Sequence, residues 1–138
     1  MKSELIIVIG LSRLGSEIAT TLSSRGKYVI VIDREAKSFQ KLGDSFTGYK
    51  IIGDACKLKN LTDANIDKAS EIDIVTDDDD TNIFLFHLIS KMNDKGRIII
   101  RLTDINKRDL LPENKCLIIT PLVNSFNQYL SFIGDKEI

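Results

Sequence analysis

The stretch LIIVIGLSRLG, residues 5–15, decides the fold of this chain. Its first part, residues 5–9, is a continuous apolar run of mostly β-branched side chains, which is typical of a strand covered on both faces in a parallel sheet. A turn bounded by Gly10 and Gly15 follows, and residues 13–25 then place apolar side chains at intervals of four, as an amphipathic helix does. The stretch therefore predicts a strand, a glycine turn and a helix, the first half of a βαβ unit.

The same alternation continues through the rest of the chain. Further short apolar runs predict strands at 28–32, 49–52, 72–76, 97–101 and 116–119. Helical patterns lie between or after them, at 35–42, 58–64, 81–93 and about 122–134. Strands that alternate with helices in this way predict an α/β fold, a Rossmann-like, doubly wound, mostly parallel six-stranded sheet. We expect a single domain over 1–138, with the Rossmann core at about 4–120 and the C-terminal helix after it.

The composition excludes several classes of protein. Hydrophobic residues make up 43% of the 138 residues and charged residues 28%, the balance of a soluble globular domain. The net charge of -1 gives no electrostatic footprint for nucleic acid. The apolar runs are far shorter than the roughly 20 residues that span a bilayer, and residues 1–4 lack the layout of a signal peptide. We therefore expect a cytoplasmic protein with no nucleic-acid partner and no direct membrane insertion, in which Cys56 and Cys116 are reduced thiols.

Doubly wound sheets bind ligands at the carboxyl ends of their strands, and the first such end here is the glycine turn. Gly10 and Gly15 match the first and third glycines of the dinucleotide-binding fingerprint, and Ser12 stands in the place of the second. Gly10 permits the tight turn and Gly15 the close approach of helix and strand, while the helix N-terminus offers N–H groups to phosphate. The Ser12 side chain narrows the gap to the backbone, although its hydroxyl can donate a hydrogen bond to phosphate in exchange. Taken alone, the motif also fits a plain strand-to-helix turn.

Two charged residues favour a nucleotide site at this turn. Asp33 ends the second expected strand about 18 positions after Gly15, close to the roughly 20 expected for the carboxylate that accepts hydrogen bonds from the adenosine ribose. An acid at this position repels a 2′-phosphate and disfavours NADP, with Arg34 as the one neighbour that weakens this argument. Arg13, in the turn itself, can clamp phosphate oxygens in bidentate fashion.

The strand ends together resemble a known family. The motifs that carry the resemblance are Gly10-x-Ser12-Arg13-x-Gly15, Val31-Ile32-Asp33, Gly53-Asp54-Ala55, Thr76-x-Asp78-Asp79-x-x-Asn82, Ile100-Arg101 and Ile119-x-Pro121. In order and spacing they are similar to the N-terminal lobe of the regulator-of-potassium-conductance family, also called KTN or TrkA-N domains, over nearly the whole chain. The resemblance implies a cytosolic gate of a potassium channel or transporter that binds NAD(H), ATP, ADP or AMP between its strand ends and assembles as a homodimer or a larger ring.

The resemblance also implies a role for each part of the site. The glycine turn would hold phosphates, Asp33 the ribose, and the end of the third strand the adenine, while the fourth and fifth strand ends would line the far side and face the distal phosphate or nicotinamide half. The candidate cofactor-binding residues are Gly10, Leu11, Ser12, Arg13, Leu14, Gly15, Asp33, Arg34, Asp54, Ala55, Thr76, Asp77 and Arg101. Ser12 leaves the choice between a mononucleotide and a dinucleotide open. The chain stops where the family usually continues into a C-terminal ligand-sensing lobe, which fits a stand-alone gate or a fragment.

The acidic run from Asp77 to Asp80 also raises the question of a metal site, since hard cations take carboxylate ligands. Successive side chains cannot all converge on one ion, and Asp79 or Asp80 is well placed to cap the helix that follows. We therefore predict no metal site. We predict no catalytic residue either, because His87, the only histidine, lies away from every expected strand end.

The helix at 81–93 is apolar nearly all round, which is unusual on the outside of a small domain. A partner that covers its outer face would explain this pattern, and self-association is the simplest choice. We expect a dimer or larger oligomer in which this helix supplies part of the contact, with Phe84 and Leu88 as the first outward-facing candidates.

Two classes of function fit these observations. The favoured hypothesis is a non-catalytic regulatory subunit or domain that binds an adenine nucleotide and gates a potassium uptake transporter or channel, peripheral to the membrane through that partner. The alternative is the nucleotide-binding domain of an NAD-dependent oxidoreductase, against which stand the absence of a substrate domain, of a Tyr-x-x-x-Lys pair and of a histidine near the site. A phosphoacceptor receiver domain of similar size would need acids where the first strand ends in Gly10.

Overall fold

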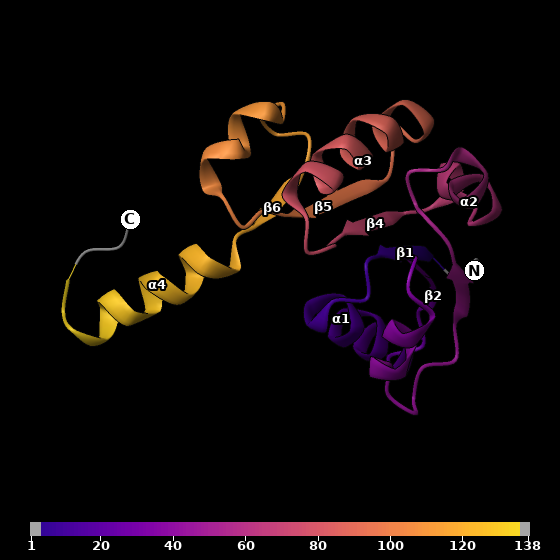
Figure 1. Ribbon diagram of the computed structural model, residues 1–138, viewed down its shortest axis with the longest axis horizontal. Helices are drawn as coiled ribbons and strands as arrows, with labels where there is room; N and C mark the ends of the chain where they lie inside the picture. Colours follow the sequence, from indigo (N-terminus) through magenta and orange to yellow (C-terminus); the bar gives the residue numbers. More distant parts are fainter. Residues whose placement is uncertain (1–3, 136–138) are drawn as a thin grey trace.

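A parallel sheet forms the centre of the protein, as the apolar runs predict. The structure, a computed structural model, describes residues 4–135, so the outermost residues of the expected domain lie outside it. Within that range, six parallel strands pair in the order β3-β2-β1-β4-β5-β6. Figure 1 shows β2, β1, β4, β5 and β6 side by side in this order. The strands are β1 (Leu5–Ile9), β2 (Tyr28–Asp33), β3 (Tyr49–Ile52), β4 (Glu71–Ile74), β5 (Arg97–Arg101) and β6 (Leu117–Ile119). The helices are α1 (Arg13–Ser24), α2 (Leu58–Asp63), α3 (Asp79–Met92) and α4 (Pro121–Phe132), with 3₁₀ helices η1 (Ala36–Lys41), η2 (Ile66–Lys68) and η3 (Ile105–Leu110).

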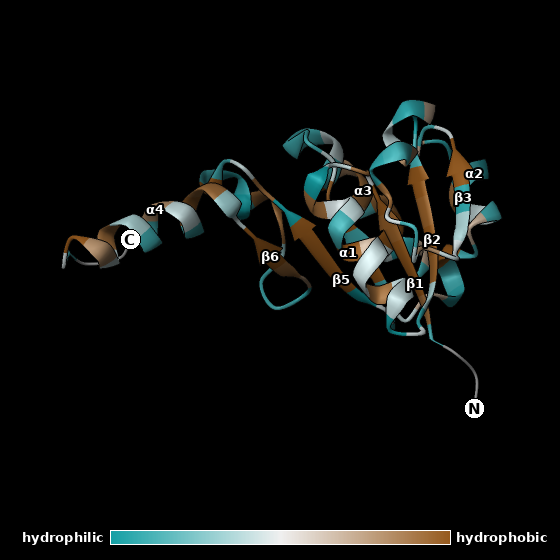
Figure 2. Ribbon diagram, turned by 90° about the horizontal axis from the view of Figure 1, so that it is seen from below, coloured by the Kyte–Doolittle hydropathy of each residue, from teal (hydrophilic) through white to brown (hydrophobic). Residues whose placement is uncertain are grey.

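Helices cover both faces of the sheet, which confirms the predicted doubly wound, Rossmann-like fold in a single domain. Ile7 and Ile9 of β1 belong to the core on the side of α2 and α3, whereas Ile6 and Val8 belong to the core on the side of α1 and η1. This is why β1 is apolar without interruption: both of its faces are buried, and the strands stand out as hydrophobic in Figure 2. Burial of each such side chain contributes about 1.5–3 kcal/mol to folding.

The strand order places the ligand-binding edge. Strand order reverses between β1 and β4, because the chain moves outward from β1 to β3 and then returns to pair β4 on the other side of β1. In open α/β sheets, the crevice for a ligand forms at such a switch point, outside the carboxyl ends of the strands. The candidate residues of the sequence analysis come from this edge.

Several elements differ from the sequence prediction at their ends. The segment expected as a helix at 35–42 forms the 3₁₀ helix η1, whose hydrogen bonds join residues three apart. β4 ends at Ile74, two residues before the predicted end at Thr76. Thr76 leaves the strand because its Oγ1 donates to Asp78 O at 3.2 Å and contacts the side chain of Asn82, which turns the chain toward α3. α3 accordingly begins two residues earlier than the pattern indicates.

Helix α3 buries more of its apolar surface within this chain than the sequence suggests. Leu88 is half-buried and packs against the core, so the prediction that it faces outward is wrong. The turn η3 lies along one side of α3, where His87 Nε2 is 2.9 Å from Leu110 O. Phe84 is 53% exposed and is the large apolar side chain that α3 presents to solvent.

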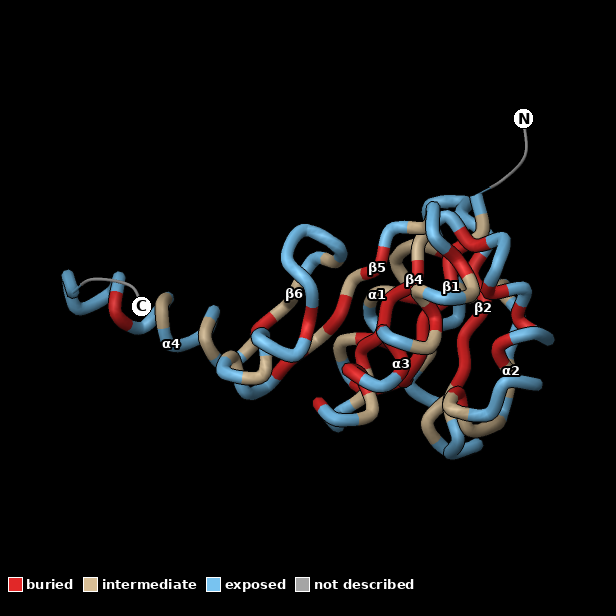
Figure 3. The backbone as a smooth tube through the Cα atoms, turned by 90° about the horizontal axis from the view of Figure 1, so that it is seen from above, coloured by how far each residue is buried: buried red, intermediate tan, exposed pale blue. Residues whose placement is uncertain are grey.

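Helix α4 extends away from the rest of the domain, beyond β6 (Figures 1 and 3). The sequence spacing places Phe126, Tyr129, Leu130 and Ile133 on one helical face, but of these only Leu130 is buried. The rings of Phe126 and Tyr129 stack on each other, with centroids 6.1 Å apart. The sheet therefore gives α4 little cover.

None of the helices in the described range 4–135 combines the length and the apolar character that a membrane-spanning helix needs.

Candidate functional site

Two neighbouring pockets open at the switch point of the sheet. The first, which we call the strand-end pocket, has a volume of about 570 Å³ and is lined by the ends of β1, β2 and β3 and by the turn after β4. The second, which we call the α4-side pocket, has a volume of about 630 Å³ and lies between the start of α1, Arg101 of β5 and the first turns of α4. Ser12, Lys41 and Asp77 line both pockets, so the two are continuous along the edge of the sheet.

The glycines of the β1–α1 turn are required by close backbone contacts. Gly10 has φ +96°, and a Cβ there would lie 2.7 Å from the backbone of Thr76. A Cβ on Gly15 would lie 2.0 Å from the carbonyl oxygen of Gly10. Only glycine lets the first turn of α1 sit against the ends of β1 and β4, which brings the helix N-terminus to the mouth of the pockets.

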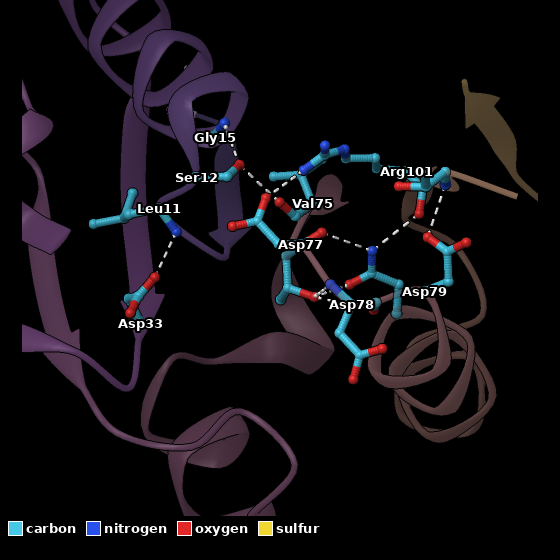
Figure 4. A network of polar contacts seen from close by, with 12 residues as sticks. Leu11, Ser12, Gly15, Asp33, Val75, Asp77, Asp78, Asp79 and Arg101 are labelled. Carbon is cyan, nitrogen blue, oxygen red and sulfur yellow. Dashed lines mark hydrogen bonds and ion pairs between the residues drawn. The ribbon is translucent and has the colours of Figure 1, made fainter. Parts of the chain in front are cut away.

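The hydroxyl of Ser12 is used by the fold rather than left for a ligand. Ser12 is the N-cap of α1: its Oγ accepts a hydrogen bond from Gly15 N at 3.1 Å and donates one to Val75 O at 2.9 Å (Figure 4). A hydroxyl has one proton to donate, so the expectation that Ser12 donates to phosphate is wrong in this structure. Donors for an anion come instead from Arg13 and Leu14, whose N–H groups in the first helical turn have no acceptor within the helix.

The carboxylate of Asp33 is fixed in direction by two backbone donors. Its Oδ2 accepts a hydrogen bond from Leu11 N at 2.7 Å (Figure 4), and its Oδ1 accepts one from Glu35 N at 2.8 Å. Each carboxylate oxygen can accept a further bond, so Asp33 can still bind a pair of hydroxyl groups. Asp33 and the adjacent Arg34 both line the strand-end pocket, where the sequence places them.

The end of β3 forms the next part of the strand-end pocket. Asp54 Oδ1 accepts from Cys56 N at 2.9 Å, and Asn60 Nδ2 donates to Asp54 O at 2.8 Å, which holds the turn that carries Ala55 into the pocket wall. Burial and the nearby charge of Asp54 raise the pKa of the Cys56 thiol, with a smaller opposing effect of Arg34. Cys56 therefore lines the pocket as a neutral thiol at physiological pH.

The four aspartates after β4 point to different partners. Asp77 pairs with Arg101 at 2.6 Å, and Asp80 pairs with Lys107 at 2.9 Å. Asp78 is the N-cap of α3 and accepts from the N–H of Asp80, so the prediction that Asp79 or Asp80 caps this helix is wrong. Asp79 is buried and accepts hydrogen bonds from two backbone N–H groups of the loop after β5, at 2.7 and 2.8 Å. The carboxylates thus serve the α3 terminus and its neighbours one by one.

Asn82 joins the ends of two strands. This buried side chain donates from Nδ2 to Thr76 O at 3.0 Å and to Arg101 O at 2.9 Å. It therefore fixes the separation of the β4 and β5 ends, on which Asp77 and the Arg101 side chain depend. The asparagine of the Thr76-x-Asp78-Asp79-x-x-Asn82 motif has a positioning role at the edge of the site.

The structure brings the predicted site residues together in two groups. Those that line the strand-end pocket are Gly10, Leu11, Ser12, Asp33, Arg34, Asp54, Ala55, Thr76 and Asp77. Those that line the α4-side pocket are Ser12, Arg13, Leu14, Asp77 and Arg101. Gly15 lines neither and acts through its contact with Gly10.

One cationic residue of the site is missing from the sequence prediction. Lys41, at the end of η1, donates from Nζ to Leu11 O at 2.9 Å and lines both pockets. No motif marks it, because a lysine in the last turn of a short helix is common on protein surfaces. Its fixed amine places a positive charge beside the glycine turn, where a phosphate would need one.

Together, the glycine turn, the exposed N-terminus of α1 and the carboxylate at the end of β2 define a class of protein: a Rossmann-type nucleotide-binding domain. Within this class the chain belongs to the TrkA-N domain family, whose sequence model matches residues 6–121.

Similar proteins include both curated relatives and solved structures. The chain is 34% identical over 110 residues to a Trk system potassium uptake protein TrkA homolog of Pyrococcus abyssi (strain GE5 / Orsay), a match that covers 80% of this chain and 48% of that protein. The chain thus spans about half the length of the curated relatives it matches. A crystal structure of GsuK bound to ADP is 28% identical, with a TM-score of 0.79 over 94% of this chain and 34% of that chain. The TrkA-N domain of the inner membrane protein ybaL from Escherichia coli has a TM-score of 0.83 over 96% of this chain and 98% of that chain, and at 14% identity it shows the fold alone.

Proposed function

We propose that this chain is a regulatory domain that binds an adenine nucleotide at the strand-end pocket and thereby controls a potassium uptake transporter or channel. The observation that carries the proposal is Asp33, whose carboxylate is oriented by two backbone N–H groups beside the glycine turn. This is the position from which a carboxylate binds the ribose of a nucleotide whose phosphates lie at the helix N-terminus. The name of the Pyrococcus abyssi relative supports the link to potassium uptake, and GsuK bound to ADP supports the ligand class.

In this proposal each part of the pocket has one task. The ribose hydroxyls donate to Asp33, and the adenine lies toward Asp54 and Ala55 at the end of β3. The first phosphate accepts from the N-terminal N–H groups of α1, close to the amine of Lys41. NAD(H), ATP, ADP and AMP all contain the adenosine phosphate that these groups would hold.

We propose a non-catalytic role, at the cytoplasmic side of the membrane through the transporter partner and within a homodimer or larger homo-oligomer. A nucleotide regulates such an assembly when it binds one arrangement of the subunits more tightly than another. Regulation of this kind needs no proton donor or nucleophile in the site. Consistent with this, burial keeps the thiol of Cys56 protonated, because it raises the pKa.

Thermal unfolding with and without nucleotide tests the proposal. A ligand at a hundredfold excess over its Kd, bound only by the folded state, stabilises the protein by about 2.7 kcal/mol, so ADP, AMP or NAD should raise the Tm. Asp33→Ala should lose most of this increase, whereas Asp63→Ala, at an exposed carboxylate paired with Lys59, should keep it. An Asp33→Ala protein that responds to nucleotides as the parent does would contradict the ribose assignment. Sustained NAD reduction with alcohol or hydroxy-acid substrates would contradict the non-catalytic role.

A further inference from the structure

Arg101 is only partly satisfied by its neighbours. Its guanidinium lies at the end of β5 in the wall of the α4-side pocket, with its side chain 21% exposed. Nη1 donates to Asp77 Oδ1 at 2.6 Å, while Nε is buried and has no hydrogen-bond partner among the described residues. A guanidinium carries five N–H donors in a planar fork that suits two oxygens of one anion. A single carboxylate oxygen from Asp77 therefore leaves much of its binding capacity unused.

Asp77 differs from the three aspartates that follow it. Asp78 caps α3, Asp79 holds the backbone of the loop after β5, and Asp80 pairs with Lys107 outside the pockets. The Asp77 side chain is 80% exposed, lines both pockets and reaches across to Arg101 (Figure 4). It gives neither a helix cap nor a buried hydrogen bond to the fold, and its negative charge lies on the path between the two pockets.

The order in which the binding groups lie along the edge of the sheet predicts which part of a nucleotide reaches Arg101. Asp33 lies in the strand-end pocket, Ser12 at the start of α1 lines both pockets, and Arg101 lines the α4-side pocket. A nucleotide with its ribose at Asp33 and its first phosphate at the N-terminus of α1 would carry its next phosphate toward Arg101. AMP ends before this point, whereas ADP and the pyrophosphate of NAD extend to it.

From this we propose, resting on the function above, that Asp77 competes with the second phosphate of the nucleotide for Arg101. The carboxylate of Asp77 occupies the guanidinium in the absence of that phosphate and swings into solvent when the phosphate arrives. Asp77 thus lowers the affinity for nucleotides with more than one phosphate. As a result, the ratio of the affinity for ADP to that for AMP is smaller than it would be without this carboxylate. A phosphate wins because it offers more oxygens and more charge to the planar fork than one carboxylate oxygen does.

Calorimetric titration with AMP and with ADP, in buffer without divalent cations, tests this inference. Asp77→Asn keeps the shape of the side chain and removes the competing charge. Exposed ion pairs are weak, so the affinity for ADP should rise about two- to fivefold while that for AMP changes little. The matched control is Asp80→Asn, which removes the same charge from the same acidic run without touching Arg101, and it should leave the ratio of the two affinities unchanged.

Arg101→Gln separates competition from a general charge effect. In this variant the preference for ADP over AMP should fall, and adding Asp77→Asn to it should give no further gain for ADP. The inference would be overturned if Asp77→Asn still raised the affinity for ADP in the Arg101→Gln background, or if Asp80→Asn raised it equally. Weaker binding of ADP by Asp77→Asn would overturn it as well. If Arg101→Gln does not fold, the ADP and AMP affinities of Asp77→Asn and Asp80→Asn still test the inference, because only the first variant should raise the affinity for ADP. Failure of the parent protein to bind either AMP or ADP would instead overturn the proposed function, and this inference with it.

Discussion

Asp73, in the middle of β4, should make the stability of this protein fall as the pH rises. Its neighbours across the sheet are Val8 on β1 and Ile99 on β5, and the side chain is 1% exposed. Neither carboxylate oxygen has a hydrogen-bond partner among the described residues. Burial raises the pKa of Asp73 from 3.8 to about 8, and the nearby negative charge of Glu71 adds to this, against a smaller opposing effect of Arg97.

The sign and size of the effect follow from proton linkage. Between pH 3.8 and about 8, the folded protein holds a proton on Asp73 that the unfolded chain has lost. The stabilisation from the neutral, buried acid is therefore complete below pH 3.8 and is lost as the pH rises through about 8. Each pH unit in this window costs roughly 1.4 kcal/mol, so from pH 5 to pH 7 the loss is about 3 kcal/mol.

Asp73→Asn removes the titration and keeps the shape of the side chain. Urea unfolding followed by circular dichroism at pH 5, 7 and 9 would give the free energy of unfolding of both proteins. The difference between variant and parent should move in favour of the variant by about 3 kcal/mol from pH 5 to pH 7. Asp63→Asn, at an exposed carboxylate, should show no such trend. A difference between Asp73→Asn and the parent that stays constant over this range would refute the reasoning.

Three further changes test the fold and the assembly. Gly15→Ala should lower the free energy of unfolding by more than about 2 kcal/mol, since its Cβ would lie 2.0 Å from Gly10 O. Gly26→Ala has open space around its Cβ and should cost only about 1 kcal/mol, because of its φ of +82°. Urea unfolding of the two variants compares these costs. Asn82→Ala should cost about 1–3 kcal/mol in the same assay, because the part-buried carbonyl groups of Thr76 and Arg101 lose their donor, and an unchanged midpoint would contradict its role in joining β4 and β5. Phe84→Asp should shift the light-scattering mass from dimer to monomer with the circular dichroism spectrum unchanged; a parent protein that is already a monomer at micromolar concentration would rule out this interface.

The sequence predicts the fold well because the strands are short and the central ones, β1 and β2, are almost continuously apolar, a pattern typical of a sheet covered on both faces. The positions of Gly10, Gly15 and Asp33 also follow from spacing, since strand ends at a switch point converge by topology. What Ser12 does could not be predicted, because its hydroxyl bonds Val75 O, far away along the chain. The pairing of Asp77 with Arg101 could not be predicted either, because these two residues also lie far apart along the chain.

Helix α3 is a case in which the sequence misplaces one side chain. The helix is apolar nearly all round, but much of its apolar surface is buried in the core of the same chain, which leaves Phe84 exposed for a partner. Local periodicity reports how much of a helix is buried, and it does not say by what. Leu88 illustrates this, because it packs against the core of its own chain.

The projecting helix α4 has a mechanical consequence. It is a rod of 12 residues, or about 18 Å at 1.5 Å per residue. Its base contributes Pro121, Asn124 and Ser125 to the α4-side pocket, while its far end carries the 78% exposed ring of Phe132. A tilt of roughly 10° at the base would carry the far end about 3 Å, given that length. A ligand in the α4-side pocket that tilted the base of α4 would therefore displace the apolar far end by a greater distance than it moves the base.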